Sequence, residues 1–542
     1  MSASSRKMLR STRAKLLLVV GLVGIYLLAS MQAANFTQQP QDPVLDHDES
    51  TSSRHDIDPE KTPAGDRRFV VVVPADDPNP DLCKVVTSAI ALGYPSPVVL
   101  NWGKDFNKHG KDFGSSHLGK ITGTLEYLEE MTRSDADDGD RLSDDDLVLV
   151  VDAYDVWFQL PPEVMLRRYH AQNQEADRRL EAQWPGSSPV EQTMRQSIIV
   201  STQKRCWPTP KDSPSRLHCH ALPESPLRRD LYGPGTDTRS LLNPWHDYRP
   251  RFLNSGTILG PAGDMRRYFR RVKEKMDRTL AANGGRLASD QGVFAEVLGE
   301  QEIWRTWRRD RAYNSSSGVS PEEAVMMAGA DFEFGVGLDY SQQMSLPTNY
   351  EEHDGQFVLL KDEDRIEQLS HRLGISPKRL SGVPSDLALA HNPLRDVAAA
   401  GEAVGGWDAM PVYADFFTTA VPVILHHNAY RLGRKYRRTQ WWSQTWFFPH
   451  LRALLELRLN ARGEAPRPLA TLPARGGGSL TYWAPASDAT KKHPRVFEAD
   501  EVAGGQGLAE LEFGELCRWP TEDEGSWRHW YDEVFRDGKG PI

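Results

Sequence analysis

The sequence predicts an α/β fold in which a mixed, mostly parallel sheet is flanked by helices. Short apolar runs, each long enough for one strand, alternate along the chain with longer stretches of helical periodicity. The apolar runs are continuous, as in "LVLVV" at 147–151, and a continuous run is typical of a strand buried on both faces. A chain of 542 residues, 39% of them hydrophobic, is also long enough to bury a large core.

The predicted elements begin at residue 67. Residues 67–75 ("RRFVVVVPA") and 96–103 ("SPVVLNWG") are expected to form buried strands, with a helix-compatible stretch between them. Residues 115–131 are expected to form a helix because their apolar side chains recur at helical spacing. These side chains are Leu118, Ile121, Leu125 and Leu128. Further buried strands are expected within 146–158 and 196–208, and this alternation of strands and helices favours parallel pairing.

The N-terminus predicts a membrane anchor. Residues 1–15 form a basic tail, and residues 16–32 form an uncharged, mainly apolar run. A cationic flank followed by an apolar run places the tail in the cytosol and the rest of the chain across the membrane. We expect a signal anchor, with a cleaved signal peptide as the alternative. Residues 33–66 are rich in Pro, Asp, Ser and Gln, which predicts a disordered stem.

Charge and cysteine content narrow the class of protein. The chain has 65 basic and 75 acidic residues, a formal charge of -10, and no basic stripe, so nucleic acid is not an expected partner. Four cysteines are too few for a disulfide-rich scaffold. In an oxidising lumen we expect a disulfide between Cys206 and Cys219, which lie on a proline-rich stretch.

Two carboxylates follow the apolar run at 147–151. Asp152 and Asp155 lie three positions apart, among apolar and aromatic residues. In an open α/β sheet ligands bind at the carboxyl ends of the strands, and oxygen ligands there suit Mg²⁺ or Mn²⁺ held together with substrate phosphates. The pair alone also fits loop solvation and capping. Nucleotide-diphosphate chemistry therefore stays open beside a metal-dependent phosphatase or nuclease reaction.

Six motifs occur in an order that resembles a known family. They are "DAYDV" (152–156), "STQKRCWP" (201–208), "FLNSGTILGP" (252–261), "SDQGVF" (289–294), "GLDYSQQM" (337–344) and "PVILHHNA" (422–429). Their order resembles the glycosyltransferase domain of the procollagen lysyl hydroxylases and the related collagen galactosyltransferases, over about residues 67–435 with long unlike insertions. The resemblance implies a GT-A-type, Rossmann-like domain at 67–436 that uses a UDP-sugar with Mn²⁺ or Mg²⁺.

The resemblance also assigns roles to single residues. Asp152, Asp155 and His426 match the metal ligands of the family, and a neutral imidazole suits Mn²⁺ beside two carboxylates. The residues expected to bind the donor are Asp152, Tyr154, Lys120, Asn254, Ser255, Gly256 and Asn428. The candidate catalytic residues are Asn254 and Asp290. Asp290 reaches sugar hydroxyls or the acceptor by resemblance, or only caps a helix.

Aromatic residues near these motifs have two interpretations each. Tyr154 and Trp157 are each expected either to stack on the uracil or to pack beneath the sheet, and core packing is favoured for Trp157. Residues 437–542 form an aromatic-rich C-terminal extension, expected to be partly helical. Its first part is expected to pack on the sheet, with a membrane-facing surface as the alternative.

Two features depart from the family pattern. The usual H-G-N-G turn is replaced by His426-His427-Asn428-Ala429, which lacks two glycines beside the expected diphosphate. No downstream segment resembles the iron-dependent domain of the hydroxylases, so we expect no lysyl hydroxylase activity.

The sequence thus predicts a metal-dependent hexosyltransferase that acts on a UDP-sugar and on a protein or glycan hydroxyl. It is expected in the Golgi or endoplasmic reticulum membrane as a single-pass type II protein with a lumenal catalytic domain. The alternatives are a catalytically silent lumenal protein that binds glycans or nucleotide sugars, and a metal-dependent phosphohydrolase.

Overall fold

The structure, a computed structural model, describes a large part of the chain. The described residues are 57–104, 115–184, 194–209, 217–239, 241, 244–287, 289–312, 327–399, 404–428, 437–461, 463, 465–489, 493–500, 505–519 and 529–542. All of them belong to a single unit, Arg54–Ile542. The predicted tail 1–15 and anchor 16–32 lie outside these residues and stay predictions.

The helices and strands follow one another in an alternating order. The strands are β1 (Gly65–Pro74), β2 (Val98–Leu100), β3 (Leu147–Val151), β4 (Val156–Phe158), β5 (Ile198–Gln203), β6 (Phe252–Pro261), β7 (Val336–Asp339), β8 (Ser345–Pro347), β9 (Gly355–Leu359), β10 (Pro411–Asp415), β11 (Ile424–His426), β12 (Ala470–Pro473), β13 (Ser479–Trp483), β14 (Arg495–Asp500) and β15 (Gly505–Glu510). The α-helices are α2 (Pro80–Ala91), α3 (Ser115–Met131), α4 (Pro162–Ala182), α5 (Leu217–His220), α6 (Ala262–Ala282), α7 (Asp290–Ala312), α9 (Glu363–Arg372), α10 (Ser385–Leu389), α11 (Leu394–Val397), α12 (Arg437–Trp442), α13 (Leu451–Asn460), α14 (Phe513–Cys517) and α15 (Trp530–Val534).

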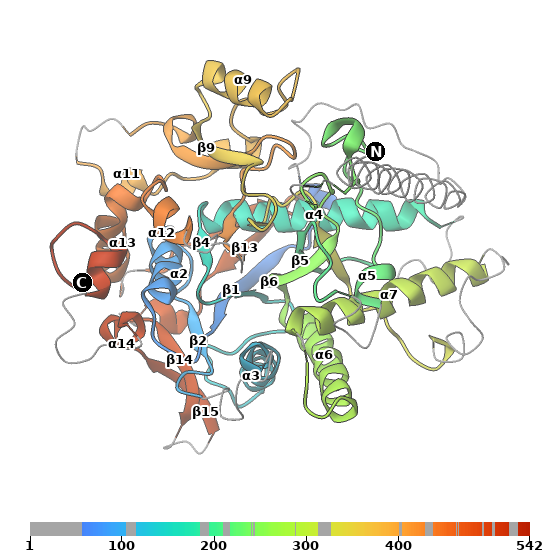
Figure 1. Cartoon of the computed structure of the whole chain (residues 1–542). Helices are drawn as coiled ribbons and strands as arrows, with labels where there is room; N and C mark the ends of the chain where they lie inside the picture. The colour runs from blue at the N-terminus through green and yellow to red at the C-terminus, as the bar shows by residue number, and fades with distance from the viewer. Residues whose placement is uncertain are drawn as a thin grey trace, which may run out of the picture. The chain divides into compact units, whose positions relative to one another are not determined.

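A mixed sheet forms the centre of the fold (Figure 1). Its strands lie in the order β15-β14-β2-β1-β3-β6-β5-β7, with β13 beside β1 and β12 beside β13. The central strands β14, β2, β1 and β3 are parallel, whereas β6 is antiparallel to both β3 and β5. The predicted α/β class, with parallel pairing at the middle of the sheet, is confirmed.

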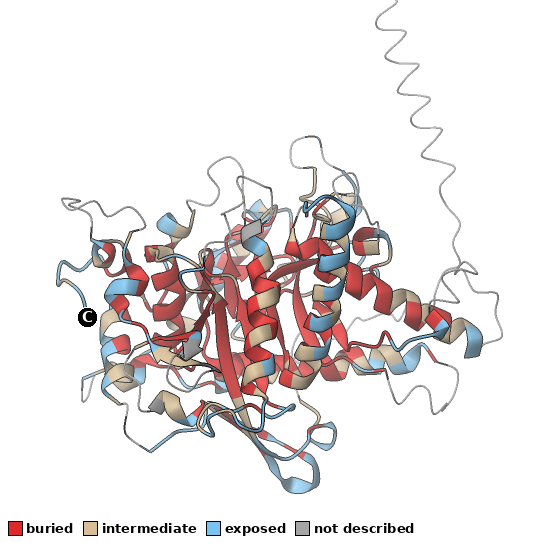
Figure 2. Ribbon diagram, turned by 90° about the horizontal axis from the view of Figure 1, so that it is seen from below, coloured by how far each residue is buried: buried red, intermediate tan, exposed pale blue. Residues whose placement is uncertain are grey.

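Helices cover both faces of the sheet. Phe69, Val71 and Val73 of β1 point into one core with residues of α2, α4 and α13. Val70 and Val72 point into a second core with residues of α3, α6 and α7. Figure 2 shows the buried strands lying between helices. The continuous apolar runs of the sequence are therefore explained by burial on both faces.

The C-terminal residues 437–542 contribute to the same sheet. Strand β13 pairs in parallel with the first half of β1, and β14 pairs in parallel with β2. A disulfide between Cys83 and Cys517 joins α2 to α14. The aromatic segment after residue 437 is largely buried, since Trp442 and Trp446 belong to the first core. These contacts make the C-terminal part integral to the unit that carries the predicted site.

A small three-stranded sheet controls the position of the last motif. Strand β11 pairs antiparallel with β4 and parallel with β8. In this register His426 lies opposite Val156, the residue that follows Asp155. The second small sheet pairs β9 with β10.

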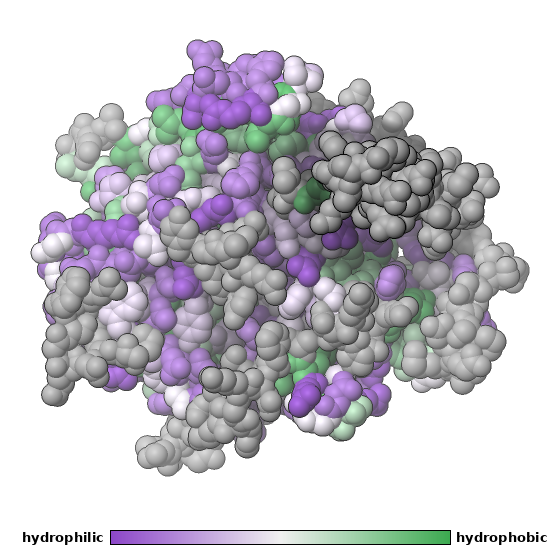
Figure 3. Space-filling model, viewed as in Figure 1, coloured by the Kyte–Doolittle hydropathy of each residue, from purple (hydrophilic) through white to green (hydrophobic). Residues whose placement is uncertain are grey.

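Three further observations concern the first described residues, the surface helix α9 and the apolar character of the helices. Residues 57–66, which end the predicted stem 33–66, contain a 3-10 helix (Pro59–Lys61) and the first residues of β1. Helix α9 forms a hydrophilic ridge at the top of Figure 3, because only Ile366, Leu369 and Ser370 on it are buried. No helix in the described ranges combines the length and the apolar character that a membrane span needs.

Candidate metal centre

The two predicted acids lie at the carboxyl end of β3, in the middle of the sheet. Asp152 follows β3 directly, and its backbone N–H donates to the carbonyl oxygen of Gly256 at 3.0 Å. Asp155 ends the turn before β4 and is buried, whereas the Asp152 side chain keeps 29% of its surface exposed. One carboxylate is thus enclosed by the protein while the other reaches solvent.

His426 is brought to the two acids by the pairing of β11 with β4. Its Nε2 atom lies 3.4 Å from Asp152 Oδ2 and 3.4 Å from Asp155 Oδ1. The ligand atoms of the three residues all lie within 4.8 Å of one another. Backbone N–H of His427 donates to the Asp155 carbonyl at 2.6 Å and fixes the end of β11 against the turn.

Gly256 makes this arrangement sterically allowed. A Cβ atom added at Gly256 would lie 2.1 Å from His426 Cε1 and 3.0 Å from Asp152 Oδ2. Any side chain there would push the imidazole away from the acids. The glycine of the "NSG" motif therefore serves the close approach of β6 to the histidine.

Asn254 orients the imidazole from the other side. His426 Nδ1 lies 3.1 Å from Asn254 Oδ1, which can only accept a hydrogen bond, so Nδ1 is turned toward Asn254 and Nε2 toward the acids. The Asn254 amide nitrogen donates to Gln203 Oε1 at 3.0 Å and to Gln291 Oε1 at 3.2 Å. Asn254 is 3% exposed, so its amide is engaged inside the protein and its geometry fits an orienting role.

Lys120 and Asp290 form a charged pair beside Asp152. Lys120 Nζ lies 2.6 Å from Asp152 Oδ1 and 2.9 Å from Asp290 Oδ2. Burial alone would lower the pKa of Lys120, but the two carboxylates outweigh burial and hold that pKa above its usual value. Burial alone would raise the pKa of Asp290, but Lys120 outweighs it, so Asp290 stays an anion.

Ser255 bonds both members of this pair, and a different residue, Ser289, caps the helix that begins at Asp290. Ser255 Oγ donates to Asp290 Oδ2 at 2.9 Å, and Lys120 Nζ donates to the Ser255 carbonyl at 3.1 Å. The first turn of α7 receives its cap from Ser289, whose Oγ accepts from the Gln291 N–H at 3.2 Å. The Asp290 carboxylate therefore belongs to the charged cluster as well as to the start of α7.

The donor set fits a hard divalent cation. An ion such as Mg²⁺ holds its ligands at about 2.1 Å, so neighbouring ligand atoms lie about 3 Å apart. The 3.4 Å separations between His426 Nε2 and the two carboxylate oxygens are close to that spacing. Two carboxylates with one imidazole also match the preference of Mn²⁺. Since Lys120 contacts Asp152 Oδ1, the other oxygen Oδ2 is the one that faces His426.

Three of the remaining predicted residues lie close to this centre. Asn428 donates to Gln203 Oε1 at 3.3 Å, so it shares a partner with Asn254. The Tyr154 hydroxyl donates to Asp76 Oδ1 at 3.1 Å, just beyond the end of β1. Trp157 is fully buried and packs on Trp442, with ring centroids 5.2 Å apart, which confirms its core position.

His427, which stands where the family pattern has glycine, fills an aromatic pocket. Its ring centroid lies 4.2 Å from that of Trp157 and 5.6 Å from that of Trp441. Burial lowers the pKa of His427 to about 3, so its ring is neutral near pH 7. The His427 ring therefore contributes packing between Trp157 and Trp441, next to the end of β11 that carries His426.

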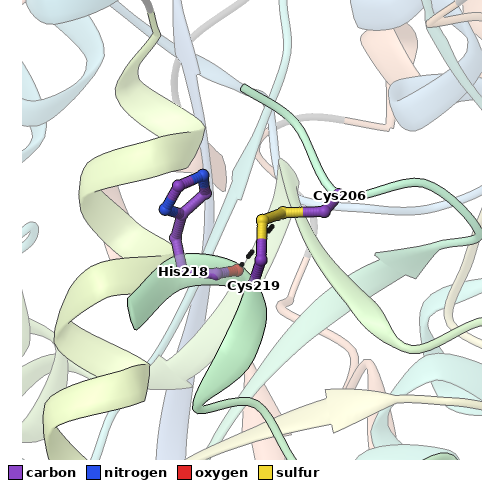
Figure 4. A group of neighbouring side chains, drawn as sticks. All are labelled: Cys206, His218 and Cys219. Carbon is purple, nitrogen blue, oxygen red and sulfur yellow. Dashed lines mark hydrogen bonds between the residues drawn. A yellow bond between two sulfur atoms is a disulfide. The ribbon is translucent and has the colours of Figure 1, made fainter. Parts of the chain in front are cut away.

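A second group of three potential ligands consists of Cys206, His218 and Cys219 (Figure 4). Its two sulfur atoms are bonded to each other, which confirms the predicted disulfide. This group therefore offers no thiolate ligands, and the three-residue centre at β3 is the stronger candidate among the described residues.

Sequence reasoning missed two residues that hold the centre together. Gln203 and Gln291 were not predicted to matter, although both bond Asn254. A polar residue at the end of a buried strand was the available signal for Gln203.

No family model matches the chain, and no curated protein sequence matches it either.

Proposed function

We propose that this protein is a metal-dependent glycosyltransferase of GT-A type that transfers a hexose from a UDP-sugar to a hydroxyl acceptor. The observation that carries the proposal is the convergence of Asp152, Asp155 and His426 at the carboxyl end of a central strand. This is the edge at which open α/β sheets bind their ligands.

The ion supplies charge neutralisation in this proposal. Mn²⁺ or Mg²⁺, held by Asp152, Asp155 and His426, would stabilise the diphosphate as a leaving group. Lys120 holds Asp152 in place through an ion pair, and Asn254 keeps Nε2 of His426 turned toward the acids. These contacts pre-organise the ligands, so little reorganisation is needed when a nucleotide sugar binds.

Asp290 is assigned an orienting role on the sugar or acceptor hydroxyls. Its pKa is held low by Lys120, which outweighs burial, so it is a weak proton acceptor at neutral pH. An anionic carboxylate can still accept a hydrogen bond from a hydroxyl and fix its direction. Asn428, which bonds Gln203, and Tyr154, which lies between the two acids in the sequence, are the proposed further contacts of the donor.

The location proposed for the protein follows from its N-terminal sequence. The basic tail 1–15 and the apolar run 16–32 support a type II orientation in the membrane of the Golgi or endoplasmic reticulum. Two disulfides in the described part are consistent with an oxidising compartment.

The test is a transfer assay with the full chain, Mn²⁺ and a panel of UDP-hexoses, with and without hydroxyl acceptors. The proposal predicts UDP release that requires metal and rises with an acceptor, together with a glycosylated product. Asp155→Ala should abolish release, whereas Asp145→Ala should not, because Asp145 is an exposed acid just before the opposite end of β3. Hydrolysis without transfer would favour a phosphohydrolase, and donor binding without turnover would favour a silent binding protein.

A further inference from the structure

The Cys206–Cys219 disulfide closes a loop that links the end of β5 to α5 (Figure 4). Cys206 lies three residues beyond the end of β5, and Cys219 lies in α5. A second contact spans the same loop, because His218 Nε2 donates to the Pro208 carbonyl at 2.7 Å. The carbonyl oxygen of His218 lies 3.6 Å from Cys206 Sγ. Residues 206–208 are thereby tied to α5 at two points.

Helix α7 fits against both ends of this loop through two glycines. A Cβ atom at Gly292 would lie 2.8 Å from Pro208 Cδ, and one at Gly299 would lie 2.8 Å from the Leu217 carbonyl oxygen. The two glycines are seven residues apart, so they lie on the same face of α7. Pro208 and Leu217 are therefore seated directly on the first half of the helix, with no room for a side chain between them and the two glycines.

The same helix end is bonded to the metal centre. Gln291 Nε2 donates to the Trp207 carbonyl at 3.0 Å, and Gln291 Oε1 accepts from Asn254 at 3.2 Å. Asn254 Oδ1 in turn accepts from His426 Nδ1 at 3.1 Å. A continuous series of contacts thus leads from the residue after Cys206 to the imidazole that faces Asp152 and Asp155.

We propose that the Cys206–Cys219 disulfide is a positioning element of the metal centre, which acts through Trp207, Gln291 and Asn254 on the orientation of His426. The proposal rests on the proposed function for its metal, but the position of His426 can be measured without a metal. Without the disulfide, only the His218–Pro208 bond ties residues 206–208 to α5 among the described residues. The Trp207 carbonyl is then less firmly placed as the partner of Gln291, and the Asn254 amide has more freedom to turn. Outer contacts of this kind commonly change metal affinity by about 10-fold to 100-fold.

The chain supplies its own control in the second disulfide. Cys83–Cys517 joins α2 to α14 and closes a much longer segment of chain. Its cysteines are fully buried in the first core. They are not part of the series of contacts that leads from Trp207 through Gln291 to His426. If the Cys206–Cys219 disulfide only stabilised the fold, its loss in Cys206→Ser/Cys219→Ser would affect the metal centre no more than the loss of the other disulfide in Cys83→Ser/Cys517→Ser.

The experiment compares these two double variants with the wild-type full chain by two readouts. The first is the ring NMR signal of His426 in metal-free protein labelled at histidine, assigned by its loss in His426→Gln. The second is the Mn²⁺ dissociation constant, measured by electron paramagnetic resonance. Loss of Cys206–Cys219 should shift the His426 signal and weaken Mn²⁺ binding about tenfold. Loss of Cys83–Cys517 should change the dissociation constant less than twofold.

A further variant tests the route and keeps the test decisive if a cysteine variant fails to fold. Gln291→Leu should shift the His426 signal with both disulfides intact, whereas Gln301→Leu should not, because Gln301 on the same helix bonds Phe334 and Val336 instead. Combining Gln291→Leu with loss of Cys206–Cys219 should weaken Mn²⁺ binding no more than either change alone.

An unchanged His426 signal in both the Cys206→Ser/Cys219→Ser and the Gln291→Leu proteins would overturn the inference. So would equal effects of the two disulfides. If the wild-type chain binds no Mn²⁺, the proposed function fails, while the metal-free His426 signal still decides whether the disulfide positions the ring.

Discussion

Two clusters of closely spaced carboxylates in the described residues differ in how their negative charge is offset. The metal-centre cluster contains Asp152, Asp155 and Asp290, with Lys120 and His426. The second cluster, here called the inner acid cluster, contains Glu351, Asp354 and Asp415, with Lys204 and His246. Both enclose more carboxylates than cations.

The metal-centre cluster leaves part of its charge facing outward. Its three ligand atoms converge within 4.8 Å, and Asp152 remains partly exposed. A cation from solution can therefore reach the carboxylates and neutralise them. Lys120 takes up only one oxygen of Asp152 and one of Asp290.

The inner acid cluster is closed and neutralised from within. Its three acids have no exposed surface, and Lys204 Nζ lies 2.6 Å from Asp354 Oδ2. His246 Nε2 lies 2.8 Å from Asp354 Oδ1. Burial, followed by the charge of Asp354, raises the pKa of Asp415 to about 7, so a proton offsets part of the charge. A candidate metal site is therefore distinguished from an internal ion-pair network by ligand atoms that converge on one point and by their exposure to solvent, rather than by the number of acids.

The largest expected effect is on the free energy of unfolding, and it follows from a substitution that removes the lysine of the inner acid cluster. Lys204→Met should lower the free energy of unfolding by about 3–5 kcal/mol, because the fully buried Asp354 loses its lysine and keeps only His246 and Tyr232 as partners. Urea or guanidinium titration measures this loss. The double change Lys204→Met/Asp354→Leu should lose less than Lys204→Met alone. A loss below about 1 kcal/mol would remove the contrast between the clusters.

The next effect concerns the metal centre alone. Asp155→Asn should weaken Mn²⁺ binding about 100-fold or more, since a ligand counts for more than its outer contacts. The free energy of unfolding should change little, because the substitution also relieves repulsion between Asp155 and Asp152. Mn²⁺ affinity that survives Asp155→Asn would place the ion elsewhere.

A smaller effect depends on pH and on Asp415. Its pKa in the folded state is about 7, well above the ordinary value of 3.8, so the folded chain binds the proton more tightly. The contribution of Asp415 to stability is therefore full below about pH 4, and it is lost as pH rises toward 7. Asp415→Asn stays neutral, so relative to wild type it should gain about 2 kcal/mol between pH 5 and pH 8.

The pH prediction is checked by urea titration of both proteins at several pH values. Glu351 lies in the same cluster, and burial raises its pKa too, so the difference between variant and wild type is the quantity to follow. The same difference at pH 5 and pH 8 would show that Asp415 does not carry the proton.

Local pattern was enough to predict the elements that carry the acids. The helix expected at 115–131 has these bounds in α3, and the strand before Asp152 is β3. Continuous apolar runs and helical spacing are properties of a few neighbouring residues, so one sequence suffices to detect them. The three candidate metal ligands were assigned by resemblance, and the structure brings their potential ligand atoms together.

Long-range pairing was beyond the reach of the sequence. The contact of His426 with the acids depends on β11 lying beside β4, and no local pattern specifies that register. The same holds for the Cys83–Cys517 disulfide, whose cysteines are 434 residues apart, and for β13 beside β1. The roles of Gln203 and Gln291 could not be predicted either, because they depend on the hydrogen bonds that both side chains accept from Asn254.

The most direct test of the account is calorimetric titration of UDP into the full chain, with and without Mn²⁺, for wild type and for Asp152→Ala/Asp155→Ala. The account predicts UDP binding that requires Mn²⁺ and is lost in the double variant, while Asp145→Ala binds as wild type does. UDP binding that is absent, or that is indifferent to both the metal and the two acids, would contradict the assignment of this centre to a nucleotide-sugar transferase.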